Sequence, residues 1–524
     1  MKKSILFISA FISANTLLGQ EPSDALRYAW TLPGGTARQQ AIGGAMGSLG
    51  GDISATFVNP AGLAFYRTGD LAITPLYRFN NNKGSYQGRT ESQKDNNFTF
   101  GTTGFVLGNG STRKGRNAAF SIAYNRTGNF KNNILYRGSN NTSSYSQKYL
   151  EEIRMNGDRD ANVVSSNLDE NDSRYNPNYT YGTSLAFNTF WIDTVGGSTN
   201  GAFDFQSRSA NLLSTGLLQE QKLQSWGGIN EIALGFGVSA SDKLMVGGTL
   251  GIPFLNYERE ATFTEVDATD NPNNNFDFAT AFENLSTKGA GINLKAGLIF
   301  KPIEYLRLGL AFHSPTIYSL TDTYTNVVSA DVENGEGLQT QSSEYFNGAP
   351  GEFKYMLATP YKVIASASYV LREIEDVSQQ RGFLTADIEY VNYKSSTFMA
   401  DSDDFSYDET KSYLNEVNEA IDNAYKGSFN VRVGGELKFT TFMVRAGAAY
   451  FGNPYQNING EKGSRLNLSG GLGYRNKGMF IDLTYVHAMT KDVHVPYRLQ
   501  SVAYNNARIK TANGNVMMTL GFKL

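Results

Sequence analysis

Apolar and polar residues alternate in segment after segment, from about residue 70 to the end of the chain. The last segment shows this most clearly, because Val516, Met518, Leu520, Phe522 and Leu524 are separated by Met, Thr, Gly and Lys. Successive side chains of a β-strand point to opposite faces, so each such segment has one apolar face. A soluble sandwich would bury that face against a second sheet, whereas a barrel in lipid exposes it to the bilayer. Because nearly every segment has this two-sided character, the pattern favours the barrel.

The gaps between these segments alternate between short and long. The segments are 70–80, 96–108, 117–128, 228–240, 243–257, 287–301, 304–327, 352–371, 383–398, 428–440, 441–451, 464–476, 478–490 and 511–524. The short gaps lie at Ser241–Asp242, Lys301–Glu304, Thr440–Thr441 and Arg475–Gly478, and the longest gap is 129–227. Short periplasmic turns and long extracellular loops are typical of outer-membrane barrels. The sequence therefore predicts an all-β fold, a 14-stranded antiparallel transmembrane β-barrel over residues 69–524.

The first twenty residues have the pattern of a secretory signal peptide. Lys2 and Lys3 precede an apolar run over 5–18, and the chain becomes polar at Gln20. The run is shorter than the ~20 apolar residues that a membrane-spanning helix needs. We therefore expect residues 1–20 to direct export and to be removed from the mature protein.

Residues 21–68 do not alternate as a strand does. The segment is rich in glycine, but apolar residues such as Trp30, Ile42, Phe57 and Phe65 make it unsuited to a solvated tail. Side chains fill the interior of a barrel of about eight strands, whereas a barrel of about sixteen strands holds a water channel. The interior of a 14-stranded barrel is intermediate in width. Its lumen would leak without an occupant. We predict that residues 21–68 form a hatch, or plug, inside the lumen, and the alternative is a disordered periplasmic tail.

A motif at the end of this segment resembles one from a known family. Asn59, Pro60, Ala61 and Gly62 lie in the run DISATFVNPAGLA just before the first strand, and LRLGLAFHSPT follows at 306–316. Further matches, including VRAG and GGLGY near the C-terminus, come in the same order. Together they resemble the FadL/TodX family of outer-membrane transporters for hydrophobic compounds, over essentially the whole chain after the signal peptide. The resemblance implies an integral barrel in the outer membrane of a Gram-negative bacterium.

The resemblance also implies a function, the passive uptake of a hydrophobic small molecule such as a long-chain fatty acid or a similar lipid. In that family apolar loops capture the molecule, the hatch rearranges, and the molecule leaves sideways through a kink in the third strand. Residues 117–128 contain no proline and only Gly128 near their end, so the sequence does not locate such an opening. Candidates for the capturing groove are Leu185, Phe187, Phe190, Trp191, Leu213 and Leu217. The alternative is that these residues pack on one another and cover the barrel mouth.

Polar side chains at lumen-facing positions are expected to line the pore or to hold the hatch. The candidates are His313, Arg432, Glu436, Arg445 and Asp482. Alternation predicts that Arg432 and Glu436 face the lumen, whereas Val431 and Val433 face lipid. A shift of one residue in this register would reverse the assignment.

The hatch motif itself predicts a tight turn. Pro60 disfavours the helical region at Asn59, and Gly62 permits a backbone conformation that other residues avoid. Asn59 would then bond neighbouring backbone or a polar group of the lumen. The sequence leaves open whether the motif controls a gate or only turns the chain into the first strand.

Composition excludes several other classes of protein. The chain has no cysteine and three scattered histidines, so we expect no disulfide, metal site or cofactor. Its net charge of −3 mixes both signs and gives no basic stripe for nucleic acid. The adjacent carboxylates Glu151 and Glu152 are far in sequence from any histidine, which favours a solvated loop over an enzyme site. The expected partners of a monomeric barrel are the bilayer, the barrel assembly machinery and a hydrophobic ligand.

Two other functions remain open at this stage. One is a non-transporting member of the family that serves as a secretion-system barrel subunit, or as a shuttle that binds exported proteins. The other is haem uptake, which three histidines make unattractive.

Overall fold

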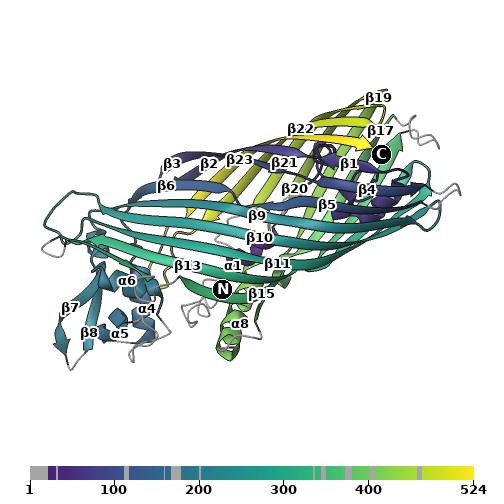
Figure 1. Cartoon of the computed structure of the whole chain (residues 1–524). Helices are drawn as coiled ribbons and strands as arrows, with labels where there is room; N and C mark the ends of the chain where they lie inside the picture. The colour runs from purple at the N-terminus through teal and green to yellow at the C-terminus, as the bar shows by residue number, and fades with distance from the viewer. Residues whose placement is uncertain are drawn as a thin grey trace, which may run out of the picture.

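A computed structural model of the chain describes residues 22–30, 34–110, 117–157, 160–166, 179–199, 202–333, 337–343, 350–371, 381–401, 407–456 and 463–524. A 21-stranded antiparallel sheet closes on itself, because its last strand pairs with its first two (Figure 1). Several crossings of the wall consist of two strands in line, so the sheet makes 14 crossings. The predicted 14-stranded antiparallel barrel is confirmed. The expected signal peptide, 1–20, lies outside the described residues and stays a prediction.

The crossings follow one another around the barrel in chain order. They are β1 (Asp70–Ile73) with β2 (Pro75–Tyr86), β3 (Arg89–Phe100) with β4 (Thr103–Gly110), β5 (Asn117–Asn129) with β6 (Asn132–Asn140), β9 (Leu217–Ser239), β10 (Leu244–Asp267), β11 (Phe278–Ile303), β12 (Leu306–His313) with β13 (Ile317–Asp331), β15 (Gly351–Ala358) with β16 (Lys362–Leu371), β17 (Gly382–Asn392) with β18 (Thr397–Ala400), β19 (Gly427–Phe439), β20 (Phe442–Phe451), β21 (Ser464–Asn476), β22 (Met479–His494) and β23 (Ala507–Lys523). A short strand, β14 (Leu338–Ser342), pairs with β13.

Three neighbouring strands are much longer than a membrane requires. β9, β10 and β11 have 23, 24 and 26 residues, whereas a strand crosses a bilayer in about 9–11 residues. More than half of each therefore stands outside the bilayer as an extracellular wall (Figure 1). The alternation pattern assigned 129–227 to a loop, but β6 occupies 132–140 and β9 already begins at Leu217. That assignment was wrong at both ends, because strands of the wall continue beyond the apolar belt with polar residues on both faces.

The outer face of the barrel is apolar. Val431 and Val433 are 40% and 46% exposed, whereas Arg432 between them is 6% exposed, which confirms the predicted register. Large side chains such as Phe236 and Phe254 are also exposed on this face. An apolar surface that surrounds a whole molecule needs lipid as its solvent, so this is a transmembrane barrel of the outer-membrane type. Among the described helices, none has the length and apolar character to cross a membrane.

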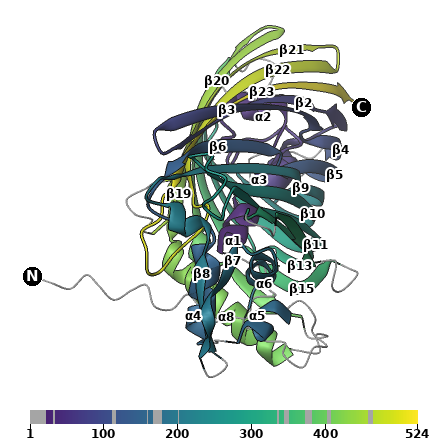
Figure 2. The same cartoon turned by 90° about the vertical axis from the view of Figure 1, so that its left-hand side faces the viewer.

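The segment before the first strand lies inside the barrel (Figure 2). It contains α1 (Pro22–Ala29), α2 (Ala37–Ala41), α3 (Ala55–Val58) and the 3₁₀-helix η1 (Pro60–Phe65). We call residues 34–66 the hatch. Most of its residues are buried, including polar ones, and strands from all around the barrel contact it. The structure thus places most of this segment inside the barrel, as the predicted fold requires, and not in a solvated tail. Its bounds of 21 and 68 and its action as a hatch stay predictions.

Glycines on the inner face of the wall let the hatch backbone touch the strand backbone. A Cβ atom added at Gly247 would overlap Pro60, and one added at Gly309 would overlap the carbonyl of Gly47. Gly434 and Gly447 stand in the same relation to Ile42. A glycine inside a strand often marks such a close approach of another backbone. At these glycines the backbones of the hatch and the wall therefore touch without a side chain between them.

The wall glycines allow a paired test. Gly247 and Gly248 are adjacent in β10 and therefore face opposite sides of the wall. A Cβ atom added at Gly247 would overlap the hatch, whereas the nearest atom to one added at Gly248 is 3.8 Å away. We expect Gly247→Ala to displace the hatch and to admit small hydrophilic solutes, while Gly248→Ala stays tight. Liposome swelling with sugars measures the leak, and heat-modifiable gel mobility confirms that both barrels assemble. Equal, wild-type permeability of the two variants would contradict this role.

Candidate functional site

Asn59 connects the hatch to the wall. Its side-chain oxygen accepts a hydrogen bond from the backbone N–H of Ala61 at 3.1 Å and so caps η1. Its Nδ2 donates to the carbonyl of Gly47 at 2.6 Å and to that of Leu298, in β11, at 3.2 Å. The segment predicted as a tight turn is thus the start of a 3₁₀-helix with Pro60 at its first position. Asn59 makes the two kinds of bond expected of it.

Gly62 has a different role from the one predicted. Its φ angle is not in the left-handed region, so it does not supply a conformation that other residues avoid. An added Cβ would instead lie 2.7 Å from the carbonyl oxygen of Leu49 and 2.9 Å from the Cβ of Ala55. The hatch therefore needs glycine here for close packing within itself.

A buried ionic cluster holds the hatch to one side of the barrel. The Nε of Arg38, in α2, donates to Glu436 at 3.3 Å, and Arg445 donates to the same oxygen at 2.5 Å. Arg445 also donates to Asp482 at 2.5 Å. Removing one partner of a buried ion pair costs about 3–5 kcal/mol, because the other charge stays buried. Three of the five predicted lumen residues therefore form one hatch-anchoring cluster, together with Arg38, which the sequence did not single out.

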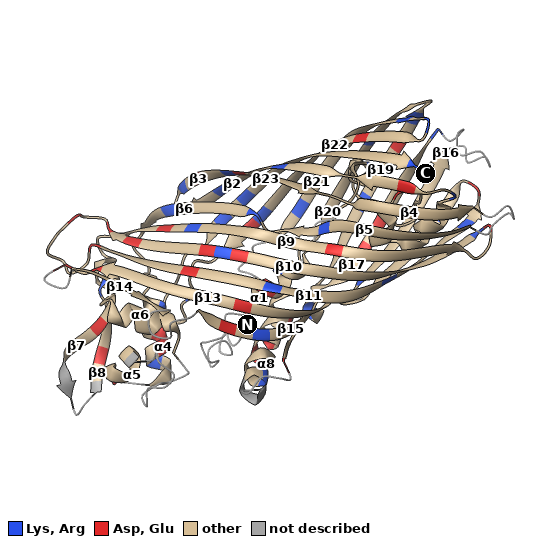
Figure 3. Cartoon of the chain, viewed as in Figure 1, with Lys and Arg blue, Asp and Glu red and all other residues tan. Residues whose placement is uncertain are grey.

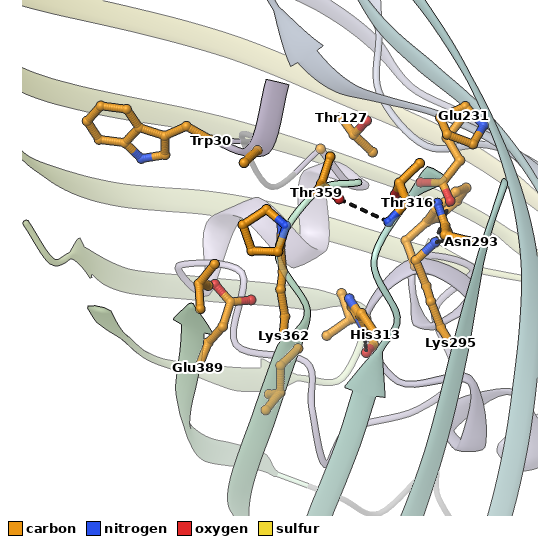
Figure 4. Close-up of a pocket in the computed structure, with 18 of the residues that line it drawn as sticks. Trp30, Thr127, Glu231, Asn293, Lys295, His313, Thr316, Thr359, Lys362 and Glu389 are labelled. Carbon is orange, nitrogen blue, oxygen red and sulfur yellow. Dashed lines mark hydrogen bonds and ion pairs between the residues drawn. The ribbon is translucent and has the colours of Figure 1, made fainter. Parts of the chain in front are cut away.

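The other two predicted lumen residues line a cavity between the hatch, α1 and the wall (Figure 4). Its volume is about 130 Å³. His313 donates from Nε2 to the carbonyl of Val58 at 2.8 Å, and Arg432 donates to Glu389 at 2.8 Å. Lys295 pairs with Glu231 at the same cavity. The cavity is thus lined both by the backbone of the hatch and by charged side chains of the wall.

The lining of this cavity is amphipathic. Its charged residues are three cations, Lys295, Lys362 and Arg432, and two carboxylates, Glu231 and Glu389. Aromatic rings also line it, among them those of Trp30, Phe57 and Tyr318. The excess of one positive charge suits an anionic group, and the rings suit an apolar one.

On the extracellular side of the cavity, α1 fills the lumen. Leu26 and Tyr28 belong to a buried apolar cluster that also includes Tyr257 and Leu357 of the wall. α8 (Tyr407–Ala424) covers this cluster from outside with its buried residues, which include Leu414. Tyr425 donates to the carbonyl of Pro22 at 2.9 Å. We call this aromatic space around α1 the vestibule.

The wall is interrupted in its backbone pairing between the second and third crossings. In the part of the chain that the structure describes, β3 pairs only with β2, and β6 pairs only with β9. β6 lies against the inner face of β2, where a Cβ at Gly84 would overlap the carbonyl of Leu135. The pairing of β5 with β4 ends at Tyr124, just before a bulge between Arg126 and Gly128 in the pairing of β5 with β9. We call the boundary between β3 and β5–β6 the seam.

Side chains alone bridge the seam. The contacts are Arg126 to Thr99 at 3.4 Å, Asn97 to Asn129 at 3.4 Å, Lys131 to Asp95 at 3.3 Å and Arg137 to Glu91 at 2.8 Å. The seam adjoins the cavity, because Asn125 and Thr127 of β5 line it. Figure 4 shows Thr127 beside Glu231 and Thr316. Sequence reasoning found no opening here, and Gly128 was the only local signal of the bulge.

The large loop forms a packed lobe beside the extracellular wall (Figure 1). Its elements are α4 (Gln147–Asn156), α5 (Ala161–Ser166), α6 (Tyr181–Asn188), β7 (Ile192–Thr199), β8 (Ala202–Ser207) and η2 (Ser209–Leu212). Leu185, Trp191 and Leu217 have no exposed surface and form its core. Phe187, Phe190 and Leu213 are partly buried against that core. In this conformation Leu185, Trp191 and Leu217 offer no surface to a ligand.

The adjacent carboxylates of this lobe are structural. Glu151 accepts hydrogen bonds from the backbone N–H groups of Gln500 at 2.7 Å and Ser501 at 2.8 Å, and Glu152 accepts one from that of Thr180 at 2.5 Å. Burial raises the pKa of the Glu152 carboxyl, although hydrogen bonds from Thr183 and Thr180 oppose the shift. The packed lobe therefore gains stability as pH falls through that raised pKa. The interpretation of this pair as part of a solvated loop was wrong.

Solved structures with the same architecture are similar to this chain. A FadL homologue from Pseudomonas aeruginosa has 13% sequence identity and a TM-score of 0.53, over 94% of this chain and 99% of that one. The P. putida toluene transporter TodX has 12% identity and a TM-score of 0.50, over 94% and 99%. No protein-family model and no curated protein sequence matches the chain. The likeness shows that the chain has the FadL-type barrel fold.

Prediction for Asn59. Asn59→Asp keeps the acceptor that caps η1 but loses the donor to Gly47 and Leu298, whereas Asn59→Ala loses both. If the contact to the wall closes the lumen, both variants should admit small sugars in liposome swelling while their barrels still assemble. If only the cap matters, Asn59→Asp should stay tight and Asn59→Ala should lose about 1 kcal/mol of local stability. Tight lumens in both variants would reduce the motif to a turn.

Proposed function

We propose that this protein is a passive outer-membrane transporter that takes up a hydrophobic small molecule, with a long-chain fatty acid or similar amphiphile as its substrate. The observation that carries the proposal is an amphipathic cavity in the lumen that adjoins an unpaired seam of the wall. The FadL-type fold supports it, since one structure of that fold is described as a toluene transporter.

The size of the cavity limits what fits without movement. A volume of about 130 Å³ is close to the ~150 Å³ of an engineered protein cavity that binds benzene. A long acyl chain therefore needs the space that α1 fills. The vestibule around α1 is lined by aromatic and aliphatic side chains, which would contact such a chain as they contact Leu26 and Tyr28. We propose that the ligand displaces α1 and places its polar end among the charges of the cavity.

The energies of the contacts favour a lateral exit over passage through the hatch. The hatch is held by the buried cluster around Arg445, where loss of one partner costs about 3–5 kcal/mol, and by backbone contact at the wall glycines. The seam is held by partly exposed side-chain contacts, and exposed ion pairs contribute about 0–1 kcal/mol each. Opening the seam therefore costs less free energy than displacing the hatch. We infer that the molecule leaves sideways into the bilayer.

Lys362 offers a test of the substrate class. It lines the cavity at the start of β16, opposite His313 in the ladder, so Lys362→Gln removes a positive charge without a large change in volume. We expect the purified variant to bind palmitate about tenfold more weakly, since hydrogen bonds to charged groups contribute about 1.5–3 kcal/mol. Binding of hexadecanol, which lacks the carboxylate, should change little. Calorimetric titration in mild detergent measures both.

Lys354→Gln is the matched control, because Lys354 lies in the same crossing but is exposed and pairs with Glu352 at 3.0 Å. It should bind both probes as the wild type does. Equal loss of palmitate and hexadecanol in Lys362→Gln would contradict the role of its charge. Absence of binding of either probe to the wild type would contradict the proposed function itself, and co-purification of exported proteins would then favour the secretion alternative.

A further inference from the structure

Three lysines stand side by side on the outer surface of the barrel. The ladder places Lys83 of β2 directly opposite Lys510 of β23, and Lys510 directly opposite Lys491 of β22. All three are exposed. Like charges directly opposite each other in neighbouring strands are destabilising. An anion bound to this row of three would therefore be stabilising, and we call it the lysine row.

Further positively charged residues border the lysine row. Lys94 of β3 and Arg508 of β23 lie one row below and one row above it, opposite Asn81 and Ser85. The other outward positions here carry uncharged side chains, namely Thr90, Ser92, Asn96, Met489, Val493 and Ala512. Among the described residues, no ion pair involves Lys83, Lys94, Lys491 or Lys510.

The opposite side of the barrel is different. There Lys288 lies 3.9 Å from Glu258, and Lys354 lies 3.0 Å from Glu352, so exposed lysines have acidic neighbours. Figure 3 shows red and blue positions together along β9, β10 and β11.

On β3 the acidic residues Glu91 and Asp95 alternate with the outward positions. They pair with Arg137 of β6 and with Lys131 just before β6, respectively. Among the described residues, the absence of acidic neighbours is therefore a property of the outer face formed by β22, β23, β2 and β3.

The lysine row lies just beyond the apolar belt. Phe79 and Tyr485 are exposed aromatic residues of the belt on β2 and β22. Lys83 follows Phe79 by four residues, which is about 13 Å along a strand, and Lys491 follows exposed Met489 by two, about 7 Å. These heights correspond to the headgroup region on the extracellular side, because β2 runs from the membrane to an extracellular turn.

We propose that this face binds the phosphorylated headgroup of a lipid A-type glycolipid in the outer leaflet. The phosphates would lie on the lysine row, and the acyl chains would lie against the aromatic and aliphatic side chains directly below it. A free phosphate or a soluble polyanion would use the charges but not this apolar surface. Lys94 belongs to β3, one edge of the seam, so the bound lipid would stand beside the proposed exit.

The test uses the full-length protein in mild detergent and three probes: bisphosphorylated lipid A, the same lipid A after dephosphorylation, and inorganic phosphate. Native mass spectrometry measures how much of each stays bound. We expect the wild type to retain bisphosphorylated lipid A and to lose the other two. The triple variant K83Q/K491Q/K510Q should bind bisphosphorylated lipid A at least about tenfold more weakly, since each basic residue near an anionic headgroup contributes to the binding free energy.

The double variant K288Q/K354Q, from the opposite face, should retain lipid A as the wild type does. Its heat-modifiable mobility and that of the triple variant verify that both barrels are folded. Three results would overturn the proposal: undiminished lipid A in the triple variant, equal retention of the dephosphorylated lipid, or equal loss in the control variant. Retention of inorganic phosphate to the same extent would assign the row to a free anion instead.

Discussion

The structure depends on how its lumen is filled. A 14-stranded barrel has room inside for more than its own side chains, and the hatch occupies this room in direct contact with the strand backbone. Glycines such as Gly247 and Gly309 permit the contact, and the ion pairs of Arg445 fix its position. Because many strong contacts fill this part of the lumen, the proposed transport of a molecule from outside needs another route.

That route follows from where the wall is weakest. The third crossing stops pairing with the second one at Tyr124, just before the bulge at Gly128, and β6 then lies inside β2 instead of beside β3. Backbone hydrogen bonds that would close the wall are replaced by side-chain contacts near the outer edge of the apolar belt. The cavity lies directly behind this boundary and is lined from the hatch as well as from the wall. The proposed binding cavity, the hatch contacts and the proposed exit therefore lie next to one another in one region of the barrel.

The sequence predicted what depends on short-range periodicity. Alternation with a period of two predicts the barrel and the orientation of Val431 and Arg432, because burial on one face is visible in each strand by itself. The groove residues were ambiguous, since Trp191 would be apolar in a ligand site and in a packed lobe alike. Gly62 was misread, because a sequence does not distinguish a positive φ from a close approach. The sequence did not reveal the seam, because the segments on its two sides each have the pattern of a strand, and that pattern does not show whether two strands pair with each other.

Cross-linking across the seam tests the account most directly. The chain has no cysteine, so Asn97→Cys and Asn129→Cys would be the only sites for a short, reducible bis-thiosulfonate reagent. The control pair is Thr264→Cys with Thr280→Cys, whose hydroxyls lie 3.2 Å apart in strands that are already hydrogen-bonded. The account predicts that the reagent stops uptake of labelled long-chain fatty acid by cells with the seam pair, that a reductant restores it, and that the control pair is unaffected. Undiminished uptake through a fully cross-linked seam would contradict it.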